Sequence, residues 1–86
     1  MLPDNINEQV KSLHLIIGEN VKRIREEKGF SQRSLSLEIG QESTTIISQA
    51  ELGKHKHFNI EQLYKMSKIL NIDMCEFFKD YQPSTV

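Results

Sequence analysis

The chain has 86 residues, of which 37% are hydrophobic and 27% are charged. A chain of this length folds as one small domain and has no room for a second hydrophobic core. Its 11 basic and 12 acidic residues give a net charge of −1. That balance excludes a protein held to nucleic acid by bulk positive charge alone, but it does not exclude a local basic surface. Residues 22–56 carry seven basic and five acidic side chains, so a small positive excess lies in this segment.

The cysteine content and the N-terminus indicate the compartment. Cys75 is the single cysteine and cannot form an internal disulfide, which predicts a protein of a reducing compartment. The first residues carry no positive flank and no long apolar run, unlike a secretory signal peptide. The longest apolar run is Leu15 to Ile17, far shorter than the roughly 20 residues that cross a membrane. We therefore expect a soluble, cytoplasmic protein with no membrane partner.

The N-terminal third of the chain has the apolar period of one long helix. Its hydrophobic residues recur at steps of three and four: Ile6, Val10, Leu13, Ile17, Val21 and Ile24. Asn5 with Glu8 fits a capping box at the start, and Gly29 fits the end. Gly18 lies within this stripe and costs a helix about 1 kcal/mol relative to alanine. The alternative is therefore two helices that break near Gly18, and we favour one continuous helix.

A short helix, a tight polar turn and another short helix come next. Ser31 is the expected N-cap of the first, and Gly40 is its expected end. The turn at 41–43 leads to a helix from about Thr44 to Leu52, closed by Gly53. The expected inward-facing residues of the two helices are Leu35, Ile39, Ile47 and Ala50.

Two further helices complete the predicted domain. After an aperiodic loop at 54–58, Asn59 with Gln62 fits a capping box and Asn71 fits a C-cap. The apolar face of this helix is formed by Leu63, Met66 and Leu70. Asp73 with Glu76 fits another capping box, which opens a last short helix that carries Met74, Phe77 and Phe78. We expect an all-α fold of five helices, with residues 1–16 as a helical extension, 17–80 as the main domain and 81–86 as a flexible tail.

The segment from Ile17 to Phe78 resembles the lambda-repressor-like, Cro/cI-type (XRE) helix-turn-helix family. The matching residues are Ile24-Arg25-Glu26-Glu27-Lys28-Gly29-Phe30-Ser31-Gln32, Leu35-Ser36, Gly40, Ile47-Ser48-Gln49-Ala50-Glu51-Leu52-Gly53-Lys54, and Leu63-Tyr64-Lys65-Met66-Ser67-Lys68-Ile69-Leu70. The step from Gly40 to Gly53 is one residue longer than is usual in the family, which places an extra residue in the turn. Ser36 and Ala50 stand where the family has alanine and a larger aliphatic residue. The resemblance implies a DNA-binding domain of five helices.

The helix that starts near Thr44 is the one that this family inserts into the major groove, where each base pair displays a distinct pattern of donors and acceptors. Thr44, Thr45 and Gln49 lie opposite its apolar face and are the predicted base contacts, with Ser48 at the edge of the same face. Glutamine bonds adenine through two hydrogen bonds, and threonine offers a hydroxyl and a methyl group. The alternative is a polar face that is simply solvated.

Phosphate contacts are predicted on both sides of that helix. In the family a glutamine at the place of Gln32 bonds a phosphate near a helix N-terminus, and the loop after the recognition helix follows the DNA backbone. The predicted set is Ser31, Gln32, Arg33, Ser43, Lys54, His55 and Lys56, with Ser31 mainly a cap. The resemblance also implies a structural ion pair between Arg25 and Glu51, which is costly to break where it is buried.

These features predict a sequence-specific regulator of transcription that binds double-stranded DNA, by default a repressor that occludes a promoter. Two protomers related by a two-fold axis would bind the half-sites of a palindromic operator, about 34 Å apart. The predicted dimer interface comprises Ile72, Met74, Phe77 and Phe78, as the resemblance implies. The alternative is that these side chains form the core of the domain, and we expect each of the two phenylalanines to serve one purpose.

Other functions fit the sequence less well. His55, His57 and Cys75 lack zinc-site spacing and a fourth ligand, so we expect no metal and no cofactor. The chain has no nucleophile motif and no glycine-rich phosphate loop, so we do not expect an enzyme. Cys75, beside Met74 and Phe77, is expected to be a packed, inert thiol. The main alternative is a protein-interaction module of the same fold, antitoxin-like or a co-regulator, with a protein partner on residues 1–16.

Overall fold

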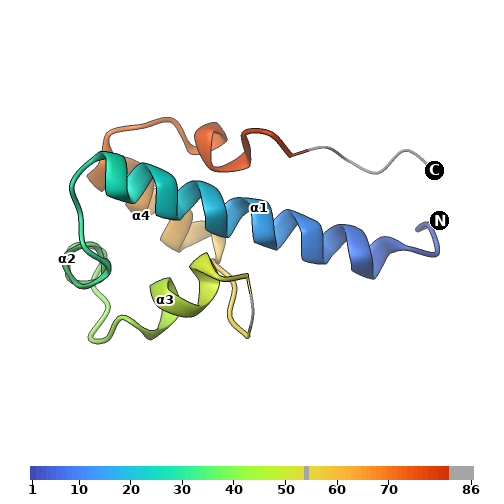
Figure 1. Ribbon diagram of the computed structural model, residues 1–86, viewed down its shortest axis with the longest axis horizontal. Coiled ribbons are helices and arrows are strands. Elements are labelled where there is room, and N and C mark those ends of the chain that lie inside the picture. The colour runs from blue at the N-terminus through green and yellow to red at the C-terminus, as the bar shows by residue number, and fades with distance from the viewer. Residues whose placement is uncertain (54, 82–86) are drawn as a thin grey trace.

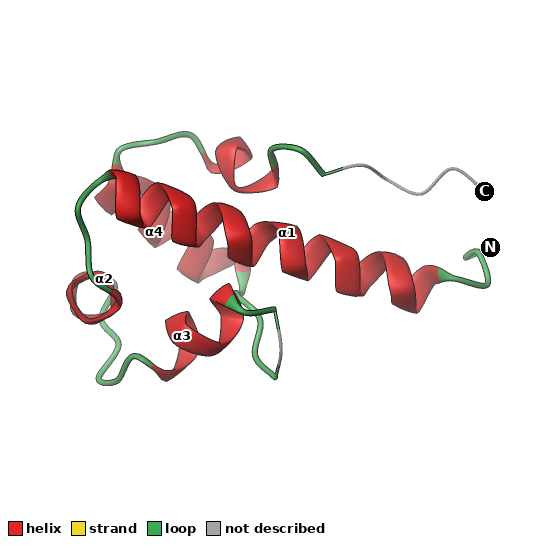
Figure 2. Ribbon diagram, in the orientation of Figure 1, coloured by secondary structure: helices red, strands yellow, loops and turns green. Residues whose placement is uncertain are grey.

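The computed structural model describes residues 1–53 and 55–81. Four α-helices and a terminal 3-10 helix follow in chain order: α1 (Ile6–Glu27), α2 (Gln32–Glu38), α3 (Thr45–Glu51), α4 (Ile60–Leu70) and η1 (Met74–Phe78). In Figure 1, α2 and α3 lie below the long α1, α4 passes behind it, and η1 lies above it. The described residues contain no strand (Figure 2), which confirms the all-α prediction. They form four α-helices rather than five, because the last predicted helix is a 3-10 helix.

The first helix is continuous over 22 residues, as favoured from the sequence. Its N-terminus differs from the prediction. Asn5 has φ −97° and ψ 23°, not the extended conformation that aims a cap side chain at the first helical amides. Its Oδ1 accepts a hydrogen bond from the Gln9 side chain at 3.0 Å, and Asn5 makes no capping bond. The predicted capping box of Asn5 with Glu8 is therefore wrong.

Most of the other predicted helix ends are confirmed. The Ser31 hydroxyl accepts a hydrogen bond from the Ser34 amide at 2.9 Å. Asn59 and Gln62 form a reciprocal capping box, with bonds of 2.7 and 2.9 Å, and Asn71 closes α4 in the left-handed conformation with φ 56°. The three glycines predicted to end helices have positive φ: Gly29 (81°), Gly40 (84°) and Gly53 (68°).

The predicted capping box of Asp73 with Glu76 is wrong. The Asp73 carboxylate accepts a hydrogen bond from the Cys75 amide, at 3.4 Å, and not from the amide of Glu76. The Glu76 amide is already used, because it donates to the backbone carbonyl of Asp73 at 3.0 Å in the 3-10 turn.

The core is formed by the apolar faces of all five elements: Ile17, Val21, Ile24, Leu35, Ile39, Ile47, Leu63, Met66, Leu70 and Phe77. The stripe of α1 enters this core from Ile17 onward. Further toward the N-terminus α1 extends past the other helices (Figure 1), and Val10 on the same stripe is 42% exposed. The first turns of α1 thus extend past the other helices (Figure 1), whereas Leu13 packs against the core.

Gly18 permits a close approach between α1 and the end of α3. A Cβ at Gly18 would overlap the carbonyl oxygen of Ala50 and would lie 2.8 Å from that of Glu51. Both atoms belong to the backbone, so no side-chain rotation relieves the contact. Packing against α3 therefore requires a glycine at this position in the middle of the helix. The sequence alone showed only that this glycine is unfavourable for helix formation.

A buried network of hydrogen bonds joins α1, α2 and α3. The Arg25 guanidinium donates to both carboxylate oxygens of Glu51, at 2.7 and 3.1 Å, and to the backbone carbonyl of Phe30 at 2.8 Å. The Gln32 side-chain amide, on the first turn of α2, donates to Glu51 Oε1 at 3.0 Å. The side chains of Arg25 and Glu51 are only 8% and 1% exposed. The ion pair implied by the resemblance is therefore present and buried.

Asn20 fixes the C-terminal segment to α1. Its side-chain amide donates to the carbonyl oxygens of Phe77 at 3.0 Å and Lys79 at 2.8 Å, and its carbonyl accepts from Arg23 at 3.1 Å. Because Asn20 is buried, its hydrogen-bonding groups need protein partners. The side chain of Phe77 inserts into the core beneath these bonds and is fully buried.

Replacing Gly18 with alanine is expected to destabilise the protein. Overpacking costs roughly 1–3 kcal/mol, and the gain in helix propensity recovers about 1 kcal/mol of it. Chemical denaturation of Gly18→Ala should therefore give a lower free energy of unfolding than that of the wild type. A stabilised variant would mean that α3 moves away from α1 at little cost.

Removing one partner of the buried ion pair is expected to cost about 3–5 kcal/mol of stability. Arg25 is then left charged and buried, with the Phe30 carbonyl at 2.8 Å and the exposed Glu26 carboxylate at 4.0 Å as its remaining partners. The change is Glu51→Ala, and the measurement is the free energy of unfolding in urea. Lys65→Ala is the matched control, since it breaks the 3.1 Å pair of Lys65 with Glu61 on the surface of α4. The control should change stability by less than about 0.5 kcal/mol. Equal effects of the two variants would contradict the structural role of Glu51.

The hydroxyl of Ser36 is buried without a hydrogen-bond partner among the described residues. Beside it lies a cavity of about 10 Å³, at the lower limit of what one water molecule needs. Ser36→Ala removes an unsatisfied polar group and is expected to raise the free energy of unfolding by about 1 kcal/mol. A loss of stability on thermal unfolding would show that the hydroxyl has a partner in solution.

Candidate nucleic-acid interface

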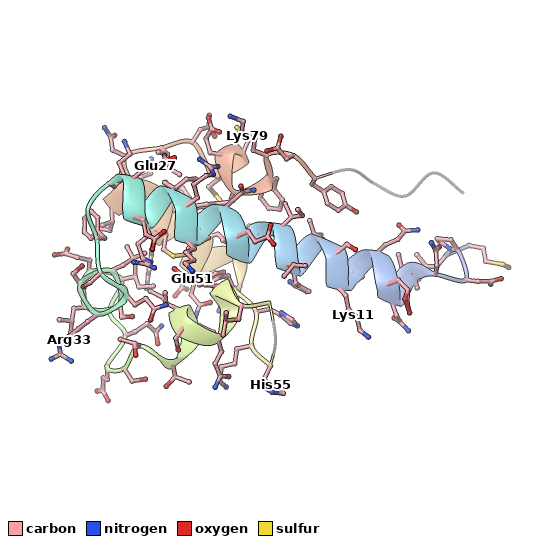
Figure 3. The ribbon with its side chains drawn as sticks, viewed as in Figure 1. Lys11, Glu27, Arg33, Glu51, His55 and Lys79 are labelled. Carbon is pink, nitrogen blue, oxygen red and sulfur yellow. The ribbon has the colours of Figure 1, made fainter. Side chains whose placement is uncertain are left out.

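The predicted DNA-contacting residues lie along one side of the molecule. Figure 3 shows Arg33 and His55 at the lower edge, where α2, α3 and the following loop lie, whereas Lys79 projects from the opposite side. Glu51 points inward between α1 and α3 in the same view. The structure thus brings most of the predicted contacts to one face, which we call the α2–α3 face: the first turn of α2, the turn 41–44, α3 and residues 55–57.

The start of α3 is settled by the structure. The helix begins at Thr45, with Thr44 as its N-cap residue, so the extra residue of the long turn lies before the helix. Thr44 makes no capping bond with its side chain. The Ser43 hydroxyl accepts weakly from the Thr45 amide, at 3.4 Å, and donates to the Thr45 hydroxyl at 3.2 Å. Ser43, predicted as a phosphate contact, thus also orders the first turn of α3.

The four predicted base-contacting residues differ in their exposure and in the hydrogen bonds that their side chains already make. Thr45 is exposed, whereas Thr44, Ser48 and Gln49 are half-buried. The Ser48 hydroxyl donates to the carbonyl of Thr45 at 3.2 Å, which leaves it as an acceptor for a ligand. The Gln49 side chain makes no hydrogen bond within residues 1–53 and 55–81, so both its donor and its acceptor are available to a partner.

Two of the predicted phosphate contacts at the start of α2 have structural roles. Ser31 is confirmed as the N-cap. The side-chain amide of Gln32 donates one of its two N–H groups to Glu51. Its second N–H group remains available to donate to a ligand. Arg33, the next residue, is exposed. In the loop after α3, His55 and Lys56 are exposed, and Lys54 lies outside the described residues.

The predicted dimer residues divide into core and surface. Phe77 is fully buried within the protomer, so its assignment to the dimer interface is wrong. Ile72 and Met74 are half-buried and pack against the core. Phe78, 38% exposed, presents its ring to solvent. The expectation that one phenylalanine serves the core and the other the surface thus fits the protomer.

Cys75 differs from its prediction as a packed thiol, because it is exposed. A hydrogen bond with Asp73 and the nearby negative charges of Asp73 and Glu76 raise the pKa of the thiol. A raised pKa lowers the fraction of reactive thiolate at neutral pH.

The structural roles of Asn20 and Gly18 were not predicted from the sequence. Asn20 and Gly18 both lie on α1 among the buried residues of the stripe. A polar residue and a glycine on an otherwise apolar face are the signals that identify them. The bond from Gln32 to Glu51 had no such signal, because glutamine is common on exposed first turns.

No helix in the described part of the chain is both long and apolar enough to cross a membrane. Across the same residues, no three His, Cys, Asp or Glu side chains come together as metal ligands would.

The comparisons with known proteins agree with this geometry. The chain shares 23% identity with the restriction-modification controller protein C.AhdI from Aeromonas hydrophila, over 76% of this chain and 96% of that one, with a TM-score of 0.68. At this identity the likeness concerns the fold. No curated protein matches the chain. A family model described as helix-turn-helix, HTH_3, matches residues 21–77, which is more than half of the chain and includes most of the core and the whole α2–α3 face. The chain therefore belongs to the XRE-type helix-turn-helix family of DNA-binding transcriptional regulators.

Proposed function

We propose that this regulator recognises a specific double-stranded DNA sequence by placing Thr44 to Gln49, at the start of and along α3, in the major groove. The observation that supports the proposal is the way α3 is anchored on one side and exposed on the other. Its outer side presents Thr45 and Gln49, with Gln49 unbonded within the described part of the chain, while its inner side is anchored through Glu51. A helix held by buried bonds presents its side chains in a fixed register, which direct readout of base edges requires.

The phosphate backbone would be held on both sides of α3. On one side lie the start of α2, with Gln32 and Arg33, and Ser43 in the turn. On the other lies the loop with His55 and Lys56. Phosphate contacts of this kind position a protein on the duplex without reading its sequence. The second N–H of Gln32 would link a phosphate, through Glu51, to the buried guanidinium of Arg25.

The protein would act as a homodimer on a palindromic operator, because one α3 reads only a few base pairs. An isologous interface through Ile72, Met74 and Phe78 would relate two recognition helices by a two-fold axis. The exposed ring of Phe78 supports this surface, and the bonds from Asn20 hold the segment in place. Repression by occlusion of a promoter is the simplest outcome of such binding.

The experiment that tests this function is an unbiased selection of DNA bound by the full chain. We expect a single palindromic motif with half-sites about one helical turn apart, and binding that weakens steeply as salt rises. A chain that enriches no sequence but retains a specific protein from the same cells would instead be an interaction module of this fold.

Gln49→Ala is expected to relax sequence preference and to cost about 1–3 kcal/mol on the selected operator. The loss should be concentrated at one base pair per half-site, because the amide bonds a single base edge. The measurement is binding affinity on the operator and on variants of it that differ at each position. An equal loss on every sequence would contradict a role of Gln49 in base readout.

Lys56→Ala serves as the contrasting variant. It is expected to weaken binding on all sequences alike and to reduce the slope of log affinity against log salt by about one unit. Lys79→Ala removes the same charge from the opposite side of the molecule (Figure 3) and should leave that slope unchanged. Equal slopes for the two variants would remove Lys56 from the phosphate-contacting set.

A further inference from the structure

The first half of α1 contacts the loop that follows α3. The rings of His14, on α1, and His57, in the loop, are stacked with centroids 3.6 Å apart and planes inclined by 10°. Gly53, at the start of the same loop, packs against Leu15 so closely that a Cβ there would lie 3.0 Å from Leu15 Cδ1 and 3.1 Å from its Cα. The loop is thus attached to α1 near both of its ends.

These contacts join a segment without an assigned role to a segment of the proposed interface. His14 and Leu15 precede the residues matched by the helix-turn-helix family, which begin at 21. His55 and Lys56, the exposed candidates for phosphate contact, lie between the two attachment points at Gly53 and His57. The position of these two side chains relative to α3 therefore depends on how firmly the loop is held to α1.

We propose that the first half of α1 positions the phosphate-contacting loop for DNA binding, with His14 as the positioning residue that holds the ring of His57. This inference rests on the proposed function, since it assigns the extension a role in presenting His55 and Lys56. His14 itself would not touch DNA. Loss of its ring would free one end of the loop and lower affinity by the cost of ordering the loop again.

The stack gives this positioning a dependence on pH. Burial, and the neighbouring charge of His57, lower the pKa of His14. A groove of about 380 Å³ beside the stack is lined by Lys11 as well as by the two histidines, and no acidic side chain lines it among the described residues. Two protonated rings in contact would repel each other, and Lys11 would add to the repulsion.

The sign of the effect follows from the lowered pKa. A histidine whose pKa is lowered by the stack stabilises the attached loop fully above its ordinary pKa of about 6.5. That stabilisation is lost as the pH falls below this value toward the lowered pKa. Acidification should therefore release the loop in the wild type and not in a variant whose ring cannot be protonated.

The DNA experiment compares three variants of the full chain on the operator obtained by selection. At about pH 7.5, above the ordinary histidine pKa, His14→Ala should weaken binding about 2- to 10-fold, the scale of one lost ring contact. His14→Phe keeps a flat ring and should bind within about twofold of the wild type. Ser12→Ala, on the same part of α1, is the control and should leave binding unchanged.

The same comparison at about pH 5.5, below the ordinary histidine pKa, measures how protonation of the stacked rings affects DNA binding. Any effect of pH that the wild type and His14→Phe share cancels in the ratio of their affinities. We expect the affinity of the wild type to fall relative to that of His14→Phe. A ratio that does not change with pH, or that rises on acidification, would overturn the proposal, as would normal binding by His14→Ala at both pH values.

A measurement without DNA separates this proposal from the proposed function. In an NMR titration of the imidazole C–H signals, His14 should have a pKa below the ordinary histidine value of about 6.5, and His57→Ala should raise the pKa of His14. Amide exchange in residues 55–57 should accelerate in His14→Ala. If the selection returns no DNA, the proposed function fails while these results still report on the loop. An unchanged titration of His14 in His57→Ala would overturn the stack itself.

Discussion

The orientation of α3, the proposed recognition helix, depends on one buried carboxylate. Glu51 lies at the last residue of α3 and accepts hydrogen bonds from Arg25 on α1 and Gln32 on α2. With only seven residues, α3 is too short to be stable by its own hydrogen bonds. Its position is set by the core contact of Ile47 on one side and by this network at its end. Apolar replacements of a buried ion pair often preserve stability, but here they would remove the directional bonds that fix the angle of α3 relative to α2.

The close crossing at Gly18 complements that network. A missing side chain lets α1 lie directly against the carbonyl groups of Ala50 and Glu51, so the end of α3 is held by packing as well as by charge. Two residues further along α1, Asn20 binds the backbone of the C-terminal segment, and about two helical turns beyond Gly18, Arg25 binds α3. A single helix therefore positions both the proposed DNA face and the proposed dimer surface, which gives the spacing of two recognition helices a rigid basis.

Features that depend on residues close together in the chain could be predicted from the sequence. The continuous first helix, the caps at Ser31 and Asn59 and the helix ends at the glycines all follow from residue types within a few positions of one another. The two predicted capping boxes were wrong because other hydrogen bonds form instead. The Asn5 side chain binds Gln9, and the Asp73 side chain binds the Cys75 amide in a 3-10 turn. The stack of His14 with His57 joins residues 43 positions apart that belong to no shared pattern. Such contacts appear only once the chain is folded.

The charge of the chain can now be placed in space. Arg25 and Glu51 neutralise each other inside the protein, so neither contributes to the field outside it. The other basic side chains of residues 22–53 and 55–56 are all exposed, among them Arg33 and Lys56 on the proposed DNA face. So small a positive excess in this segment attracts DNA only weakly and without regard to sequence. Affinity must therefore come mainly from correctly placed contacts. A regulator of this kind gains more from a loop held in position than from an added lysine, because each correctly placed phosphate contact also fixes the register in which Gln49 meets a base.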